Sequence, residues 1–433
     1  MTHIIGIRHE DKYLMERRVA ITPAHVAKLT KTGLEFVVEK SPKRIFSDNE
    51  FEVAGAETAD NLRKAGVIFG VKEIPVHHFE EGKTYVFFSH VIKGQPYNMP
   101  MLKVMMNKGC SLIDYEKIEN DEGKRLIFFG RYAGLAGAIN SLWSLGQRLL
   151  AQGIENPFSG LRQAVKYNSL NEAREAIAAV GKEISLNGLP DQLWPFSVGV
   201  TGYGNVAGGA HEILNLLPSI EITPEQLLKL NKNNAAKNML YKVIFREKDL
   251  SKPVDANMAF DLPHYYTHPE AYQSDFEQYI PKLGMLLNCM YWDKRYPRIV
   301  TKDFLEKLYA AGEPAIKVIG DISCDPDGSI ECTHKGTEIE DPVFVYNPST
   351  RQPEMGFNGP GLCVMAVDIL PSELPREASQ GFGDALFPYV KAIAEADFEQ
   401  SFDNLKLPNP IKKAMILHKG KLTPSYEYIS KYL

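Results

Sequence analysis

The feature that most constrains this chain is a glycine-rich turn between a buried strand and a helix. An apolar run at Phe196–Val200 leads into Thr201-Gly202-Tyr203-Gly204-Asn205-Val206-Ala207-Gly208-Gly209-Ala210, and an apolar helix follows at Ile213–Leu217. Gly202 permits a tight turn, Gly204 lets the backbone approach a pyrophosphate, and Ala207 or Gly208 lets the helix pack on the strand. A tight turn without a ligand is the alternative. The context favours a dinucleotide site at Gly202, Gly204, Asn205, Val206 and Gly208, with the positive end of the helix facing the phosphates.

Short apolar runs alternate with helical patterns along the rest of the chain, which is typical of an α/β protein with mainly parallel sheets. Capping sequences mark several helix starts, among them Thr22-Pro23 and Ser47-Asp48-Asn49-Glu50. The predicted strands before the glycine turn are Ile4–Ile7, Phe36–Glu39, Val67–Val71, Tyr85–Phe88, Ser111–Asp114 and Leu126–Phe129, and those after it include Ser219–Thr223, Met285–Met290 and Ile316–Ile322.

Composition narrows the class of protein. The 433 residues allow two or three domains, and the net charge of -5 is spread without long runs. We therefore expect no nucleic-acid binding and no membrane association. The N-terminus has no signal-peptide pattern, and the five cysteines are scattered without a C-x-x-C pair. These features predict a cytoplasmic protein with reduced thiols and no metal site.

The strand after the glycine turn bears on the choice of dinucleotide. In a Rossmann fold, an acidic residue at the end of that strand holds the ribose diol of NAD. The next run reads Ser219-Ile220-Glu221-Ile222-Thr223-Pro224, so Thr223 occupies the expected acidic position. A missing carboxylate removes repulsion against a 2′-phosphate, which favours NADPH, while Glu221 or Glu225 leaves NADH as the less favoured alternative.

Two residues able to transfer protons follow consecutive predicted strands. Lys72 comes after Val67–Val71, and His90 comes shortly after Tyr85–Phe88. Because the carboxyl ends of parallel strands share one edge, we expect the two side chains to be neighbours there. A lysine can accept protons and a histidine can donate them near neutral pH, which imine formation requires. A solvated or structural role for each is the alternative.

Other charged residues follow strand ends in the same pattern. Arg18 and Arg131 are candidates to bind a dicarboxylic oxo acid, because a guanidinium group makes paired contacts with a carboxylate. Glu73 and Glu116 offer carboxylates to an ammonium group or to Lys72. Asp321, at the end of a predicted strand, is expected near the cofactor. Surface ion pairing is the alternative for each of them.

The sequence resembles the superfamily of alanine dehydrogenase, the transhydrogenase α-subunit and lysine-forming saccharopine dehydrogenase. It is most similar to the lysine–ketoglutarate reductase half of bifunctional aminoadipate semialdehyde synthase. The matching stretches span nearly the whole chain and include Ile7-Arg8-His9-Glu10, Glu16-Arg17-Arg18-Val19-Ala20-Ile21-Thr22-Pro23, Gly70-Val71-Lys72-Glu73, Phe87-Phe88-Ser89-His90-Val91-Ile92-Lys93-Gly94-Gln95, Ile113-Asp114-Tyr115-Glu116-Lys117, Phe129-Gly130-Arg131 and Asp321-Ile322-Ser323.

The resemblance implies two Rossmann-like domains with a cleft between them. Residues 1–135 plus 370–433 would form the substrate domain, and residues 136–369 the dinucleotide-binding domain. It implies reductive condensation of lysine with 2-oxoglutarate to saccharopine, with Lys72 and His90 as acid and base. The implied substrate-binding residues are Arg18, Arg131, Glu73, Glu116 and Lys93, and Asp321 would lie near the nicotinamide.

Two departures leave alternatives open. The bifunctional enzymes continue into a saccharopine-cleaving dehydrogenase, so we expect a separate enzyme to complete that step here. Thr223 also stands where relatives carry an acidic residue. The alternatives are reductive amination of another amine and oxo acid, as in alanine dehydrogenase, and a non-catalytic dinucleotide-binding subunit.

Overall fold

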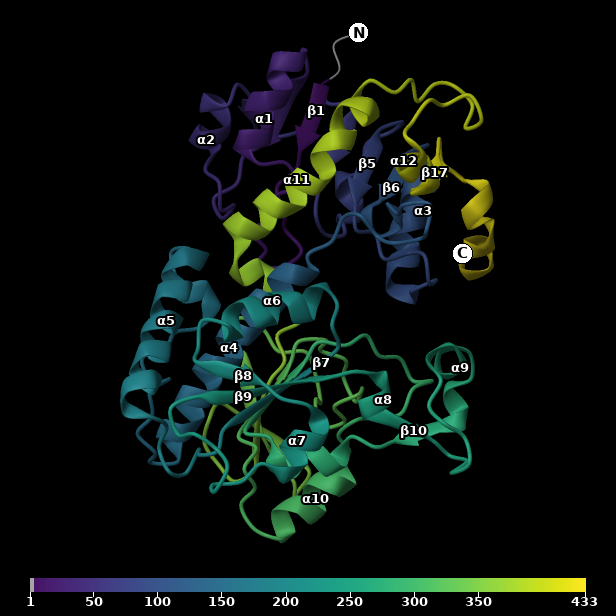
Figure 1. Cartoon of the computed structure of the whole chain (residues 1–433). Helices are drawn as coiled ribbons and strands as arrows, with labels where there is room; N and C mark the ends of the chain where they lie inside the picture. The colour runs from purple at the N-terminus through teal and green to yellow at the C-terminus, as the bar shows by residue number, and fades with distance from the viewer. Residues whose placement is uncertain (1–3) are drawn as a thin grey trace. The chain divides into compact units, whose positions relative to one another are not determined.

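A computed structural model describes residues 4–433, which form two compact units. The first unit contains residues 4–129 and 375–433, and the second contains residues 130–374. Each unit is built on one eight-stranded sheet (Figure 1). The predicted α/β class with mainly parallel sheets is confirmed.

The sheet of the first unit is parallel over six strands and closed at one edge by two antiparallel strands from the C-terminal segment. In sheet order the strands are β18 (Lys421–Leu422), β17 (Met415–His418), β6 (Ser111–Asp114), β5 (Thr84–Phe87), β4 (Val67–Phe69), β1 (Ile4–Ile7), β2 (Glu35–Glu39) and β3 (Glu57–Ala59). Apart from the edge strand β3, the parallel strands are mostly buried, as expected for a sheet covered on both faces.

The helices of the first unit begin at the residues that the capping patterns predict. Thr22 precedes α1 with a proline at its first position, and the Ser47 hydroxyl accepts a hydrogen bond from the backbone of Glu50 at the start of α2. The helices are α1 (Pro23–Leu29), α2 (Asp48–Val53), α3 (Met99–Asn107), α11 (Pro375–Ala394) and α12 (Asn409–Lys413), and the 3-10 segments are Thr30–Thr32, Val76–His78, Pro96–Asn98, Tyr115–Lys117 and Pro424–Tyr432. His25 of α1 lies 2.9 Å from Asp384 of α11, which ties the C-terminal segment to the start of the chain.

The second unit has the glycine turn at the centre of its sheet. In sheet order the strands are β15 (Gln352–Met355), β14 (Val343–Asn347), β16 (Leu362–Met365), β13 (Val318–Asp321), β12 (Met285–Asn288), β7 (Ser197–Thr201), β9 (Leu240–Phe245) and β8 (Ser219–Glu221). The helices are α4 (Gly130–Ala151), α5 (Leu170–Asn187), α6 (Asn205–Leu214), α7 (Pro224–Lys229), α8 (Glu247–Leu250), α9 (Leu262–Thr267) and α10 (Lys302–Ala310), and the 3-10 segments are Ala164–Lys166, Pro269–Ala271, Glu277–Lys282 and Leu370–Glu373. A two-stranded ribbon, β10 (Ser251–Pro253) with β11 (Tyr272–Ser274), projects beside α9 (Figure 1).

The predicted strand Leu126–Phe129 is wrong. These residues form no strand, and α4 begins directly after them at Gly130. The apolar side chains are used for packing instead of strand pairing, because the Phe129 ring stacks on Phe382 at 4.4 Å. Arg131 therefore lies in the first turn of a helix rather than after a strand end.

Candidate active site

The carboxyl ends of four neighbouring strands gather charged side chains at one edge of the first sheet. Glu10 follows β1, Lys72 and Glu73 follow β4, His90 follows β5, and Asp114 ends β6. The strands lie in the order β6, β5, β4, β1, so their end loops are neighbours. Lys72 and His90 thus follow the adjacent parallel strands β4 and β5.

Glu73 links its own loop to the loops of His90 and Lys12, because one of its oxygens contacts both side chains. His90 Nδ1 lies 2.8 Å and Lys12 Nζ 2.7 Å from Glu73 Oε1. Burial alone would raise the pKa of Glu73, but the hydrogen bonds from His90 and Lys12 outweigh it and lower the pKa to about 2. The other oxygen, Oε2, is buried and has no hydrogen-bond partner in the described chain. Glu73 is therefore an ionised carboxylate with one oxygen available to an ammonium group.

His90 is held in an uncommon backbone conformation, with φ at +50°. A residue that carries a side chain adopts this left-handed region only at a cost in free energy, and such residues concentrate at functional sites. The side chain is about one-third exposed, and its ring stacks on Phe88 with a centroid separation of 6.1 Å. The Glu73 contact and the Phe88 stack together fix the direction of the imidazole.

Glu10 fixes the backbone at Lys72. Its two carboxylate oxygens accept hydrogen bonds from the backbone N–H groups of Val71 at 2.7 Å and Lys72 at 2.9 Å. Burial raises the pKa of Glu10 to about 7, because the carboxyl group is removed from water. The Lys72 side chain is half-buried, with Nζ 6.0 Å from the centre of the Tyr13 ring. Sequence reasoning missed Glu10 and Lys12, although Glu10 follows β1 in the same strand-end pattern as Lys72.

Arg18 is locked in place by Glu16. Its Nε and Nη2 atoms lie 2.8 Å and 2.6 Å from the two oxygens of that carboxylate, and both side chains are buried. The guanidinium group also lies 4.1 Å from the centre of the Phe129 ring. Burial acts to raise the pKa of Glu16, but Arg18, and to a lesser extent Lys72, lower it below its ordinary value. Arg18 and Lys72 are thus electrostatically coupled through one buried carboxylate.

The remaining predicted substrate residues of the first unit lie farther along the same edge. The backbone of Glu116 donates to Asp114 at 2.8 Å, and its side chain contacts Arg125 at 3.1 Å. Lys93 is exposed, three residues after His90 in the same loop. Burial raises the pKa of Asp114 to about 6, and this carboxylate accepts hydrogen bonds from the backbone and hydroxyl of Ser89.

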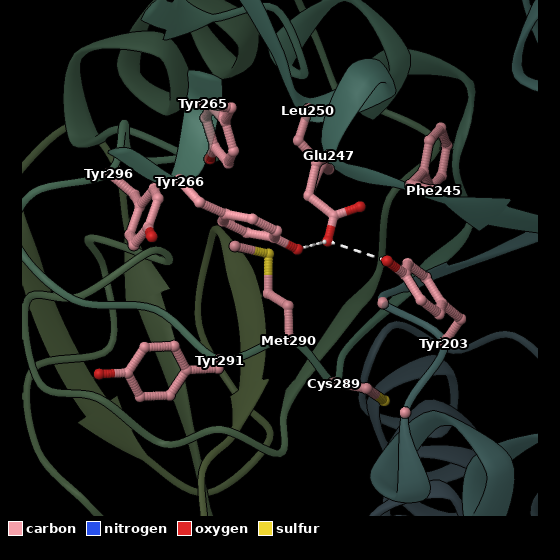
Figure 2. Close-up of a pocket in the computed structure, with 12 residues that line it drawn as sticks. Tyr203, Phe245, Glu247, Leu250, Tyr265, Tyr266, Cys289, Met290, Tyr291 and Tyr296 are labelled. Atoms are coloured by element: carbon pink, nitrogen blue, oxygen red, sulfur yellow. Dashed lines mark hydrogen bonds between the residues drawn. The ribbon is translucent and has the colours of Figure 1, made fainter. Parts of the chain in front are cut away.

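The glycine turn of the second unit has the shape that phosphates require. Gly202 adopts a φ of +83°, and a side-chain carbon built on Gly204 would meet nothing within 4 Å. The helix α6 begins directly afterwards at Asn205, so its first backbone N–H groups border this open space. A cavity of about 310 Å³ adjoins the turn and is lined by Tyr203, Phe245, Tyr265, Tyr266, Met290 and Tyr296, among others (Figure 2). These residues fit a dinucleotide.

The strand that precedes Thr223 is not the neighbour of the strand that leads into the glycine turn. The next strand in sequence, β8, lies at the sheet edge, whereas the neighbour of β7 is β9. Thr223 caps α7, where its hydroxyl accepts a hydrogen bond from the backbone N–H of Gln226, and together with Arg246 it lines a second cavity rather than the one beside the glycine turn. The strand beside β7 is β9, which ends at Phe245 and is followed by Arg246 and Glu247.

Glu247 points into the cavity between two tyrosines. Its Oε1 atom accepts hydrogen bonds from Tyr266 at 2.7 Å and from Tyr203, the residue between the two turn glycines, at 3.2 Å (Figure 2). Arg246 is exposed and its guanidinium group lies 4.6 Å from the centre of the Tyr203 ring. Sequence reasoning missed both residues, although the run Leu240–Phe245 could have been recognised as a strand.

Three other predicted residues of the second unit lie outside the cavity beside the glycine turn. Asp321 is buried, accepts hydrogen bonds from Asn288 at 2.9 Å and Thr333 at 2.7 Å, and does not line the cavity. Burial raises its pKa to about 6. A side-chain carbon on Gly208 would meet no atom within 4 Å, so of the two residues predicted to allow close packing only Ala207 is buried, together with Gly209. Arg131 is paired with Glu212 of α6 at 2.6 and 2.8 Å.

Within residues 4–433, no group of three or more metal-binding side chains occurs. The five cysteines are unpaired and buried, and burial raises their pKa values. No helix in this range combines the length and apolar character that crossing a membrane demands.

Two family models match the chain. The alanine dehydrogenase/PNT N-terminal domain covers residues 6–136, and the C-terminal domain covers residues 265–425. The chain belongs to the alanine dehydrogenase/PNT family. Among solved structures, its fold is similar to an L-alanine dehydrogenase, with a TM-score of 0.58 and 17% identity over 99% of both chains. It is also similar to a transhydrogenase from Sinorhizobium meliloti, with a TM-score of 0.53 and 15% identity over 97% of this chain and 100% of that one.

Curated relatives place the chain more narrowly within the family. It is 39% identical to alpha-aminoadipic semialdehyde synthase of Arabidopsis thaliana over 99% of this chain and 41% of that protein. It is 34% identical to the mitochondrial enzyme of the same name from Mus musculus, over 99% of this chain and 48% of that protein. The chain thus spans less than half the length of these relatives. A saccharopine dehydrogenase [NAD(+), L-lysine-forming] of Yarrowia lipolytica is 27% identical over 91% of this chain and 93% of its own length. The chain is thus similar both to part of these synthases and to a lysine-forming saccharopine dehydrogenase over most of its length.

Proposed function

We propose that this protein reductively condenses the side-chain amine of L-lysine with 2-oxoglutarate to form saccharopine, using NADPH. The observation that carries the proposal is the strand-end cluster of Lys72, Glu73 and His90, in a chain that matches lysine-forming saccharopine dehydrogenases over most of its length. Imine formation requires proton transfer in both directions, and the cluster supplies a lysine, an ionised carboxylate and an imidazole on neighbouring loops.

The residues of the first unit have separate roles in the proposed reaction. The free Glu73 oxygen receives an ammonium group of the substrate, and the Arg18 guanidinium group attracts a substrate carboxylate. Lys72 removes a proton from the attacking amine, and His90 gives a proton to the carbonyl oxygen, which later leaves as water. Glu116 and Lys93 lie along the same edge as further contacts for substrate carboxylate and ammonium groups. Arg131, whose guanidinium group pairs with Glu212, remains a candidate for carboxylate binding.

The second unit holds the dinucleotide in this proposal. Gly202, Gly204, Asn205 and Val206 cradle the pyrophosphate, and Asp321 fixes the end of β13 through its hydrogen bonds. When bound, the reduced nicotinamide supplies the hydride that converts the imine to a secondary amine.

The choice of dinucleotide depends on two adjacent residues. Arg246 has no ion-pair partner among residues 4–433 and can pair with a 2′-phosphate, whereas Glu247 is already engaged by two tyrosine hydroxyls. This favours NADPH. NADH is the second candidate, because Glu247 also suits a ribose diol and the fungal relative is named for NAD(+).

Substitution of Arg246 tests directly whether the protein prefers NADPH or NADH. Arg246→Ala is expected to lower kcat/KM for NADPH by about tenfold or more, the value of one charge-assisted contact, with less than about a twofold change for NADH. Lys232→Ala, which removes an exposed cation at Trp194, is a matched control. An equal loss with both dinucleotides would show that Arg246 does not recognise a 2′-phosphate.

The function itself is tested by following oxidation of the reduced dinucleotide with 2-oxoglutarate and a panel of amines. We expect lysine to give the highest kcat/KM and saccharopine to be the product identified by mass spectrometry. Faster turnover of ammonia with pyruvate would make the protein an alanine dehydrogenase-type enzyme. The absence of turnover with every pair would support a non-catalytic subunit.

A further inference from the structure

The loop that carries His90 is contacted by the last helical segment of the chain. This segment, Pro424–Tyr432, is anchored by two residues on one side: Ile429 is fully buried, and the buried Tyr426 donates a hydrogen bond to the carbonyl of Lys413 at 2.8 Å. Tyr428 and Tyr432, four residues apart, are exposed and reach the loop. The segment is thus fixed by one pair of residues and makes its outward contacts with another.

Both contacts fall on the backbone just after His90. The Tyr428 hydroxyl donates to the carbonyl of Ile92 at 2.7 Å. The Tyr432 ring covers Gly94, because a side-chain carbon built there would lie 2.4 Å from the ring. Gly94 has a φ of +68°, and its N–H donates to the carbonyl of Val91 at 2.9 Å, which closes the turn.

The turn directly follows a residue in a strained backbone conformation, because His90 lies in the left-handed region with a φ of +50°. Asn98 donates to the His90 carbonyl at 3.3 Å, and Asp114 accepts a hydrogen bond from the backbone of Ser89. A strained residue persists only where its surroundings over-determine it. The two tyrosines contact Ile92 and Gly94, which Asn98 and Asp114 do not bind.

We propose that Tyr428 and Tyr432 are positioning residues that hold His90 in register with Glu73, so that the C-terminal segment is part of the active-site machinery without touching a substrate. The inference rests on the proposed function of His90. It predicts that loosening either tyrosine slows proton transfer more than it weakens the binding of substrates or dinucleotide.

Variants at Tyr432 test the proposal. Tyr432→Ala is expected to lower kcat by about tenfold or more, since a misplacement of a reacting group of about 1 Å can cost up to about a hundredfold, while KM for lysine and 2-oxoglutarate changes by less than about twofold. Tyr432→Phe keeps the ring and should restore kcat. Tyr428→Phe removes only the hydroxyl contact and should have a smaller effect of the same kind. Unchanged kcat in Tyr432→Ala, or no rescue by phenylalanine, would overturn the proposal.

A comparison of two glycines provides a matched control in which the loop residue is changed instead of the tyrosine. Gly94 and Gly123 have similar left-handed φ values of +68° and +74°, but only Gly94 faces a ring. Gly94→Ala should reduce kcat well beyond Gly123→Ala, and Tyr432→Ala should recover part of the Gly94→Ala loss by removing the clash. Additive losses in the double variant would contradict the ring contact.

Hydrogen–deuterium exchange separates this proposal from the proposed function. Tyr432→Ala should speed amide exchange in residues 89–98 by about tenfold, while exchange in Gly123→Ala stays as in the wild type there. If the wild-type protein fails to turn over lysine and 2-oxoglutarate, the proposed function fails, and the exchange result still decides whether the segment holds the loop. An unchanged exchange rate in Tyr432→Ala would refute the proposal that the C-terminal segment holds the loop.

Discussion

Replacing Lys72 with methionine is expected to lower turnover of lysine and 2-oxoglutarate at least roughly tenfold, within the range of acid–base catalysis. The Glu10 contact should be kept, because Glu10 binds the backbone N–H of this residue and not its side chain. Methionine preserves much of the length and apolar character of the lysine stem but cannot exchange a proton. Steady-state kinetics with NADPH measures the effect, and Lys64→Met, at an exposed lysine paired with Glu57, is the control.

A second substitution separates proton transfer from charge. Lys72→Arg keeps the positive charge that helps to lower the pKa of Glu16, so the Arg18–Glu16 pair should be preserved. A guanidinium group does not release a proton at neutral pH, so turnover should remain low. Recovery of activity in Lys72→Arg would assign Lys72 an electrostatic role, and near-wild-type rates in Lys72→Met would remove it from the mechanism.

The strand-end residues of the first unit could be predicted because the signal is local. A short apolar run followed by a polar residue marks the end of a buried strand, and parallel strands bring those ends to one edge. This reasoning found Lys72 and His90, and it extends to Glu10 after β1. Their hydrogen-bond partners could not be predicted in the same way. The Lys12–Glu73–His90 arrangement depends on side-chain directions that no sequence spacing specifies.

The errors have a common physical origin, which is that sequence order does not give spatial order. The edge strand β8 precedes β9 in the chain, yet β9 lies beside β7, so the neighbour of the glycine-turn strand comes from a later segment than the sequence pattern indicates. The run Leu126–Phe129 is apolar because Phe129 packs on Phe382, which is more than 250 residues away in the chain. In both cases a distant segment decides the outcome.

Substitution of a glycine in α6 is expected to have the second large effect, which is on the free energy of unfolding. A side-chain carbon at Gly209 would lie 2.1 Å from the carbonyl oxygen of Arg131 in α4, and one at Gly134 of α4 would lie 1.9 Å from the carbonyl oxygen of Val206. Both obstacles are backbone atoms, so relief requires the two helices to separate. Gly209→Ala is therefore expected to lower the free energy of unfolding by about 3 kcal/mol or to prevent folding, at the upper end of overpacking costs.

Gly208→Ala is the matched control, since this neighbouring residue of the same helix is exposed and meets nothing within 4 Å. Alanine there should raise stability by roughly 0.5–1 kcal/mol, because glycine is the poorer helix former. Urea unfolding measures both changes. The packing also bears on function, because α4 fixes the helix whose first residues border the glycine turn. Where Gly209→Ala still folds, its affinity for NADPH should fall while that of Gly208→Ala is retained. Equal stability of the two variants would show that the close helix contact does not exist in solution.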